Sequence, residues 1–303
     1  MGALMERIKQ GKVLVSDGAM GSFLIDLGLR AGECPESWCV SRPESVRGIL
    51  QAYVDAGSEI IETNSFGGNS VKLGAYGLAG SVAELNRAAA ALAREIVGSR
   101  GFVFGSVGPT GQFVKGEGGK IAAESLYDVF KPQVMALAEG GADAICMETM
   151  WSLQEAAQAI RAAKENTGLP VICTFTFNAG ARGFRTAVGL SPERAAAGSL
   201  EAGADVIGAN CGNGIDEMIE ITKLMRAAAP NAPILIHANA GLPAFEDGKT
   251  VYRETPDYMA SRIPALMSAG ATIIGGCCGT APAHIAAIAK AVRGSPSASS
   301  AAK

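Results

Sequence analysis

Four copies of one short junction recur along the chain, and they constrain its fold more than any other feature. They read Asp-Ala-Gly-Ser-Glu-Ile-Ile at 55–61, Glu-Gly-Gly-Ala-Asp-Ala-Ile at 139–145, Glu-Ala-Gly-Ala-Asp-Val-Ile at 201–207 and Ser-Ala-Gly-Ala-Thr-Ile-Ile at 268–274. In each copy the central glycine stands where a helix ends in a conformation with positive φ, and an apolar strand follows at once. The junction is therefore typical of a repeated helix-to-strand unit.

The same pattern of short apolar runs and amphipathic segments predicts eight strands with helices after them. Eight such pairs favour a single α/β domain, a (β/α)8 TIM barrel over residues 1–293, above an open doubly wound sheet. Residues 294–303 are rich in Ser and Ala, lack periodicity, and are predicted to be a short disordered tail. The expected strands lie near 13–16, 60–63, 102–107, 144–147, 171–177, 206–209, 234–238 and 273–275.

Composition narrows the function classes. The net charge is −3, and no run of Lys or Arg interleaves with aromatic residues, which argues against nucleic acid as a partner. The first ten residues lack the apolar core of a secretory signal, and no apolar stretch approaches the ~18 residues of a membrane span. We therefore expect a soluble cytoplasmic protein whose seven cysteines are free thiols or metal ligands.

Three of these cysteines lie at the ends of predicted strands, Cys211 in Gly-Ala-Asn-Cys-Gly and the pair Cys277 and Cys278 in Gly-Gly-Cys-Cys-Gly-Thr. Three thiolates around Zn²⁺ leave the fourth position open, as in catalytic rather than structural zinc sites. Adjacent residues of a regular strand face opposite ways, so the pair can bind one ion only where the flanking glycines let the backbone leave extended geometry. The alternative is three small buried hydrophobic side chains.

Other polar residues follow the predicted strands, where a barrel of this kind carries its active site. Cys146 and Cys173 lie within strands and are expected to pack in the core, and Cys34 and Cys39 are expected to be ordinary thiols. His237 is expected at the pocket wall, and His284 on a helix surface or at a helix cap. The polar strand-end residues are Asp17, Glu62, Thr63, Asn64, Glu148, Thr149, Asn210 and Asn239.

Six segments at successive strand ends stand out together: Asp-Gly-Ala-Met-Gly at 17–21, Glu-Thr-Asn-Ser-Phe at 62–66, Gly-Ser-Val-Gly-Pro-Thr-Gly at 105–111, Asn-Cys at 210–211, Asn-Ala-Gly at 239–241 and Gly-Gly-Cys-Cys-Gly-Thr at 275–280. Together they resemble the motifs of the homocysteine S-methyltransferase family, whose members are zinc barrels. The likeness is greatest to the homocysteine-binding barrel of cobalamin-dependent methionine synthase, and it covers nearly the whole chain. Six motifs in order at successive strand ends are far more specific than any single glycine-rich turn.

The resemblance implies that Cys211, Cys277 and Cys278 are the catalytic zinc ligands, and that Asn239 approaches the metal when substrate is absent. It also implies that Asp17 and Glu148 hold the amino acid end of homocysteine, whose ammonium group requires carboxylate partners. Asn64 is predicted as a further substrate-binding residue, although polar residues at a strand end also brace loops.

The implied reaction is methylation of homocysteine to methionine. A free thiol has a pKa of about 8.5, and coordination to zinc supplies the nucleophilic thiolate. The family draws methyl groups from methylcobalamin, betaine or S-methylmethionine. The chain has no Asp-x-His-x-x-Gly cobalamin signature, so methylcobalamin is expected to arrive on a separate corrinoid protein.

Three alternatives stay open at the level of sequence. The donor can be a small molecule such as S-methylmethionine or betaine, and the acceptor can be another thiol. A metal-binding or regulatory barrel without activity is a third possibility, against which the retained Asp17, Glu148 and three cysteines argue. The sequence does not specify the oligomeric state.

Overall fold

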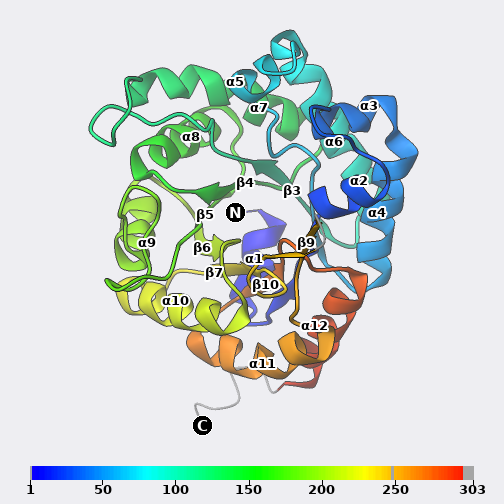
Figure 1. Cartoon of the computed structure of the whole chain (residues 1–303), viewed down its shortest axis with the longest axis vertical. Coiled ribbons are helices and arrows are strands. Elements are labelled where there is room, and N and C mark those ends of the chain that lie inside the picture. The colour runs from blue at the N-terminus through cyan, green and yellow to red at the C-terminus, as the bar shows by residue number, and fades with distance from the viewer. Residues whose placement is uncertain (1, 247–248, 296–303) are drawn as a thin grey trace.

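A computed structural model describes residues 2–246 and 249–295. Eight parallel strands form one sheet in the order β1-β10-β7-β6-β5-β4-β3-β2, and helices surround it (Figure 1). A parallel bridge between Ser16 and Ile60 joins the two edge strands and closes the barrel. The strands are β1 Leu14–Val15, β2 Ile60–Glu62, β3 Phe102–Val107, β4 Ala144–Met150, β5 Val171–Phe175, β6 Val206–Asn210, β7 Ile234–Ala238 and β10 Ile273–Gly276.

All eight strands that the sequence predicts are present, and the predicted (β/α)8 barrel is confirmed. The four junction glycines have φ values of 103°, 103°, 103° and 108°, as expected for the ends of helices. The α-helices are α1 Ala3–Lys9, α2 Gly21–Asp26, α3 Trp38–Ser41, α4 Pro43–Asp55, α5 Ser70–Gly74, α6 Val82–Val97, α7 Leu126–Glu139, α8 Leu153–Asn166, α9 Pro192–Glu201, α10 Ile215–Ala228, α11 Pro256–Ala269 and α12 Pro282–Gly294.

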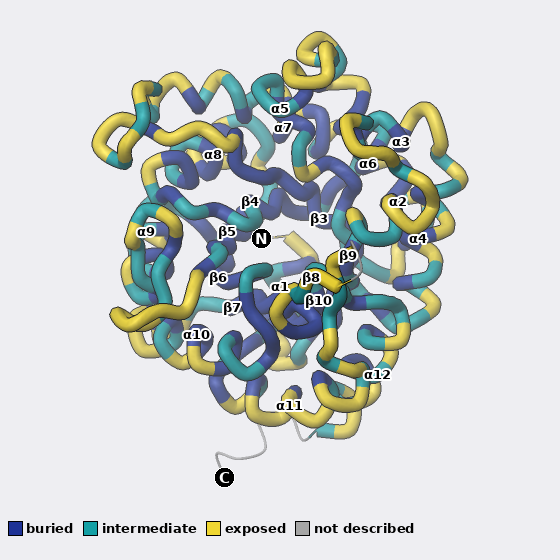
Figure 2. The backbone as a smooth tube through the Cα atoms, in the orientation of Figure 1, coloured by how far each residue is buried: buried dark blue, intermediate teal, exposed yellow. Residues whose placement is uncertain are grey.

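Strand alternation divides the buried strand residues between two cores. Residues such as Val15, Ile61 and Met147 face the outer helices and join them in the larger core. The alternate residues face the barrel axis and form a compact apolar plug, in which α1 contributes Leu4 and Ile8. In Figure 2 the strands form a buried ring, and Figure 1 shows α1 within it. The strand residues of the plug are Leu14, Ile60, Phe104, Ala144, Cys146, Ile172, Val206, Leu235 and Ile273.

Helix α1 and an antiparallel hairpin have no counterpart in the sequence prediction. The hairpin consists of β8 Ala244–Glu246 and β9 Lys249–Val251 and follows β7. Most of the expected tail, residues 296–303, lies outside the described residues. Within the described part of the chain, no helix combines the length and the apolar character that crossing a bilayer requires.

Candidate functional site: a three-cysteine cluster beside three acids

The polar site lies directly above the apolar plug, at the carboxyl ends of the strands. A step of two residues along a strand returns to the same face of the sheet. Two residues beyond Ile60 is Glu62, and two beyond Leu235 is His237. The same step from Leu14, Phe104, Cys146, Ile172 and Gly208 leads to Ser16, Ser106, Glu148, Thr174 and Asn210. The inner face of the barrel therefore changes from apolar to polar within one layer of side chains.

The structure brings the three strand-end cysteines together. Their sulfur atoms all lie within 4.8 Å of one another, and those of Cys211 and Cys278 are 3.7 Å apart. Four sulfurs placed tetrahedrally at about 2.3 Å from Zn²⁺ would be about 3.8 Å apart, so the spacing of Cys211 and Cys278 suits such an ion. Among the described residues this is the one group of three or more potential ligands with metal-like spacing. The donor set therefore fits zinc.

The backbone leaves extended geometry at these cysteines, as the sequence indicates. Cys211 has a φ of 59°, which is uncommon for a residue with a side chain. Strand β10 ends at Gly276, and a turn closes with a hydrogen bond from the Thr280 N–H to the Cys277 carbonyl (3.1 Å). Adjacent cysteines can thus contribute to one cluster.

The flanking glycines serve two different purposes, which corrects the expectation that all of them provide unusual φ values. Only Gly279 of the three has positive φ, at 79°. A Cβ on Gly275 would lie 2.7 Å from the Asp17 carbonyl oxygen, and a Cβ on Gly276 would lie 2.3 Å from the Thr280 hydroxyl. At these two positions glycine is required by close packing rather than by dihedral angle.

The contacts among the three sulfurs affect their pKa values unequally. Hydrogen bonds from the thiols of Cys211 and Cys277 lower the pKa of Cys278 to about 3, and a hydrogen bond with Tyr252 acts in the same direction. The same sulfur contacts, first with Cys211 and then with Cys278, raise the pKa of Cys277 well above its ordinary value. These contacts therefore favour Cys278 as the thiolate of the cluster.

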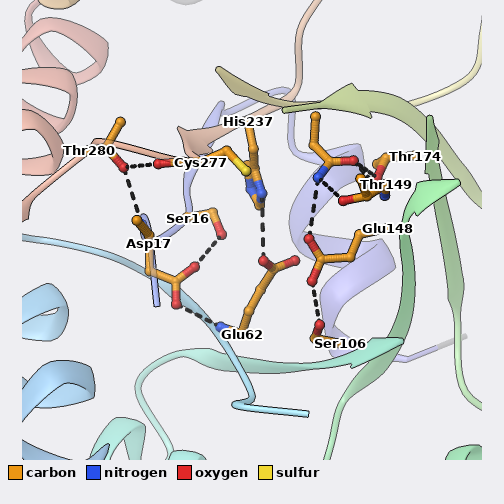
Figure 3. A network of polar contacts seen from close by, with 12 residues as sticks. Ser16, Asp17, Glu62, Ser106, Glu148, Thr149, Thr174, His237, Cys277 and Thr280 are labelled. Atoms are coloured by element: carbon orange, nitrogen blue, oxygen red, sulfur yellow. Dashed lines mark hydrogen bonds and ion pairs between the residues drawn. The ribbon is translucent and has the colours of Figure 1, made fainter. Parts of the chain in front are cut away.

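Three carboxyl groups, those of Asp17, Glu62 and Glu148, lie in the same layer (Figure 3). Burial is the main cause of the raised pKa of each: to about 8 for Asp17, to about 7 for Glu148, and well above the ordinary value for Glu62. Repulsion from Glu148 adds to the shifts of Asp17 and Glu62. A bound cation would relieve both effects, since an opposite charge favours the ionised carboxylate.

Hydrogen bonds hold two of the acids in place. The carboxylate of Asp17 accepts from the Glu62 N–H (2.8 Å) and from the Ser16 hydroxyl (3.3 Å). That of Glu148 accepts from the Ser106 hydroxyl and from the Asn210 amide (3.3 Å). These partners come from four different strands or strand ends, so the position of each acid depends on the closed barrel.

His237 lies at the wall of this polar layer, as expected, and it is almost fully buried. Its Nδ1 is 3.7 Å from the nearer carboxyl oxygen of Glu62 (Figure 3). Burial lowers the pKa of His237 to about 3, so the ring is neutral at physiological pH. It can accept or donate a hydrogen bond without adding charge.

The two predicted asparagines differ in their surroundings. Asn239 is buried beside the cluster, where the neighbouring Ala240 N–H donates to the Cys278 carbonyl (3.0 Å). Its Oδ1 has no hydrogen-bond partner among the described residues, a free acceptor that suits a ligand. Asn64 instead donates to the Pro35 carbonyl (2.9 Å) and braces the segment after β1. Its role in substrate binding stays a prediction.

The other cysteines and the second histidine behave as the sequence indicates. Cys146 and Cys173 are fully buried in strands, and Cys34 and Cys39 are buried free thiols. The Nδ1 of His284 accepts from the Ala281 N–H (3.1 Å) and caps α12.

Two residues contribute more to the site than their sequence context indicates. The Asn210 side chain bonds to both Glu148 and Thr149. Strand alternation indicates only that this side chain faces inward. Tyr252 follows the unpredicted hairpin and packs its ring against Gly279, where an added Cβ would lie 2.2 Å from the ring. No local sequence pattern places Tyr252 at the cysteines.

Comparisons with known proteins agree with this architecture. The family model for homocysteine S-methyltransferase matches residues 14–292. Methionine synthases of Mycobacterium leprae and Mycobacterium tuberculosis are 31% and 32% identical over 95% and 93% of this chain. The crystal structure of the homocysteine methyltransferase MmuM from Escherichia coli, in its metallated form, superposes with a TM-score of 0.79 at 22% identity, covering 95% of this chain and 99% of that one.

These findings define the protein as a (β/α)8-barrel methyltransferase. Within that class, the chain belongs to the homocysteine S-methyltransferase family. It spans about a quarter of the length of the two methionine synthases, each matched over 25% of its length. What those longer proteins do as a whole is therefore a separate question from what this barrel does.

Proposed function

We propose that this barrel is a zinc-dependent methyltransferase that converts homocysteine to methionine. The observation that carries the proposal is the meeting of three cysteine sulfurs, at separations suited to Zn²⁺, with three carboxyl groups of raised pKa in one polar layer. The two features match the two ends of homocysteine, a thiol and an amino acid.

In this proposal Cys211, Cys277 and Cys278 hold zinc, and Asn239 lies next to the position that the substrate thiol takes. Bound zinc supplies acidity, because a thiol that coordinates the metal is deprotonated at neutral pH. The chain's contribution is to present three sulfurs, with no fourth cysteine or histidine in the group among the described residues, which leaves room for the substrate. This arrangement distinguishes a catalytic from a structural site.

Asp17 and Glu148 hold the amino acid end. Asp17 is buried and Glu148 is half-buried, and hydrogen bonds already place both carboxyl groups, so little reorganisation accompanies binding. The substrate ammonium restores the ionised form of these acids, and the ion pairs then form in a water-poor layer where electrostatic attraction is strong. The acids thereby orient the thiol toward the cysteine cluster.

For the methyl donor we propose methylcobalamin carried by a corrinoid protein. The similarity to methionine synthases, above 30% identity over nearly the whole chain, supports this donor. S-methylmethionine and betaine are the competing donors, and another thiol is the competing acceptor.

The test is a donor and acceptor screen on purified protein of measured zinc content. We expect methionine from homocysteine and a methylated corrinoid protein, with no product after the metal is removed and recovery after zinc is restored. Methionine formed only from S-methylmethionine or betaine would reject the corrinoid donor. Failure with homocysteine alongside turnover of a different thiol would reject the acceptor, and a zinc-free active protein would reject the metal.

A further inference from the structure

We propose that Asn210 is a positioning residue that holds Glu148 in register with Cys211 and so sets the distance between the amino and thiol ends of the bound substrate. The inference deepens the proposed function and rests on it for the identity of the substrate. It assigns to Asn210 a role beyond that of a buried hydrogen-bonding residue.

The Asn210 side chain uses its whole hydrogen-bonding capacity on two other strands. Its Oδ1 accepts from the Thr149 N–H (2.7 Å) and from the Thr174 hydroxyl (2.7 Å). Its Nδ2 donates to the Thr149 hydroxyl (2.7 Å) and to the Glu148 carboxylate (3.3 Å). An amide has two donor hydrogens and two acceptor lone pairs, so nothing is left over. From β6 this single side chain thus reaches across β5 to β4.

The part of β4 that Asn210 holds is a bulge. Met147 pairs with Cys173 and Met150 pairs with Phe175, so β4 contains one residue more than β5 over this stretch. Met147 and Met150 both face the helix-side core, which regular alternation would not allow for residues three apart. The bulge therefore lets Glu148 and Thr149 both face the polar layer.

The bulge requires an unfavourable backbone conformation. Thr149 has a φ of 59°, and a β-branched residue with positive φ is a genuine outlier. Such a conformation persists only where surrounding interactions hold it. Both the N–H and the hydroxyl of Thr149 are bonded to Asn210. The Asn210 amide is thus the group placed to maintain the bulge.

The next residue after Asn210 is the cluster ligand Cys211, which also has a φ of 59°. The Cys211 N–H donates to the carbonyl of His237 on β7 (3.1 Å), and this bond ties the backbone of Cys211 to that strand. Residues 210–211 therefore supply one sulfur of the cluster and, through the Asn210 side chain, also hold Glu148 in position. Loss of the Asn210 bonds would free the bulge to shift, and a one-residue shift turns side chains to the opposite face.

The experiment measures equilibrium binding to zinc-loaded protein by calorimetry. Homocysteine is compared with 1-propanethiol, which has the same thiol end and neither ammonium nor carboxylate. Asn210→Asp keeps an acceptor for Thr149 and Thr174 but removes both donated bonds, and Asn210→Ala removes all four without adding charge. Asn166→Asp is the matched control, since Asn166 also donates two bonds, to the Tyr127 hydroxyl and the Ala162 carbonyl, on an outer helix.

We expect the dissociation constant for homocysteine to rise about 10- to 100-fold in both Asn210 variants, the effect of losing a charged hydrogen-bonded partner. Binding of 1-propanethiol and zinc content should match the wild type, and the control should bind both thiols normally. Equal weakening of both thiols, or unchanged homocysteine binding, would overturn the proposal.

A second measurement does not depend on the substrate. Hydrogen exchange of the Thr149 amide should be slow in the wild type and in Asn210→Asp, and fast in Asn210→Ala. Slow exchange in Asn210→Ala would show that the bulge does not depend on Asn210 and would overturn the inference. A wild type that shows this protection but does not bind homocysteine would instead reject the proposed substrate and leave the role of Asn210 at the bulge confirmed.

Discussion

Replacing Asp17 with asparagine should stabilise the protein at neutral pH while weakening its proposed function. Asp17 is almost fully buried, and burial raises its pKa from 3.8 to about 8. Asparagine has nearly the same shape. Its oxygen can accept from the Glu62 N–H, and its NH₂ can donate to the Ser16 hydroxyl, which rotates to accept.

The magnitude follows from proton linkage. Between pH 3.8 and about 8 the folded chain retains a proton on Asp17 that the unfolded chain releases. Because the pKa of Asp17 is higher in the folded state than in the unfolded state, its protonation does not reduce stability below the unfolded-state pKa. The free energy of unfolding then falls as the pH rises toward the folded-state pKa. One pKa unit corresponds to about 1.4 kcal/mol, so the loss at pH 7 is on the order of 4 kcal/mol for this group.

The assay is urea unfolding of wild type and Asp17→Asn at several pH values from 5 to 8, at matched zinc content. The free energy of unfolding of the variant, relative to wild type, should increase steadily over this range, with unchanged m-values. Asp55→Asn, on the exposed end of α4, is the control and should follow the wild type. The reasoning fails if Asp17→Asn and wild type show parallel pH profiles.

The same variant tests function, because a buried carboxylate that holds an ammonium group contributes about 1.5–3 kcal/mol. Its KM for homocysteine should therefore rise roughly 10- to 100-fold. An unchanged KM would remove Asp17 from the proposed binding site, whatever its effect on stability.

Four further predictions concern the cysteine cluster. Cys211→Ser and Cys278→Ser should fold normally by circular dichroism but retain little zinc by elemental analysis; wild-type zinc content would contradict the ligand assignment. Gly279→Ala should lower the free energy of unfolding by about 1–3 kcal/mol, because φ is 79° and the new Cβ would lie 2.2 Å from the Tyr252 ring; an unchanged melting curve would contradict this. Tyr252→Phe should lose zinc to a competing chelator about 10-fold more readily, as expected for loss of a group that supports a ligand, and equal retention would exclude that role. Removal of zinc from the wild type should abolish methyl transfer, and zinc should restore it; activity in the stripped protein would refute the metal requirement.

Much of the barrel could be predicted from the sequence because its signals are local. The four junction glycines end helices through their own backbone preference, which requires no tertiary contact. The apolar runs after them form strands in the structure. These glycines are Gly57, Gly141, Gly203 and Gly270. Strand alternation likewise determines that Glu62, Glu148 and His237 share a face.

The sequence also predicted that the cysteine pair belongs to the site, but it did not predict why each flanking residue is glycine. Gly279 provides a positive φ, whereas Gly275 and Gly276 make room for the Asp17 carbonyl and for Thr280. These contacts join residues more than 250 positions apart or across a turn, and no local pattern records the first of them.

The sequence by itself determined the barrel, the end of it that carries the polar residues, and the three cysteines proposed as zinc ligands. Only the tertiary structure decided that Asn210 reaches the bulge at Thr149, that Tyr252 covers Gly279, and that Asp17 has a strongly raised pKa. The physical reason is that backbone preferences and side-chain alternation act between near neighbours in the chain. Desolvation, bulges and contacts across the barrel arise only when distant strands close around a common space.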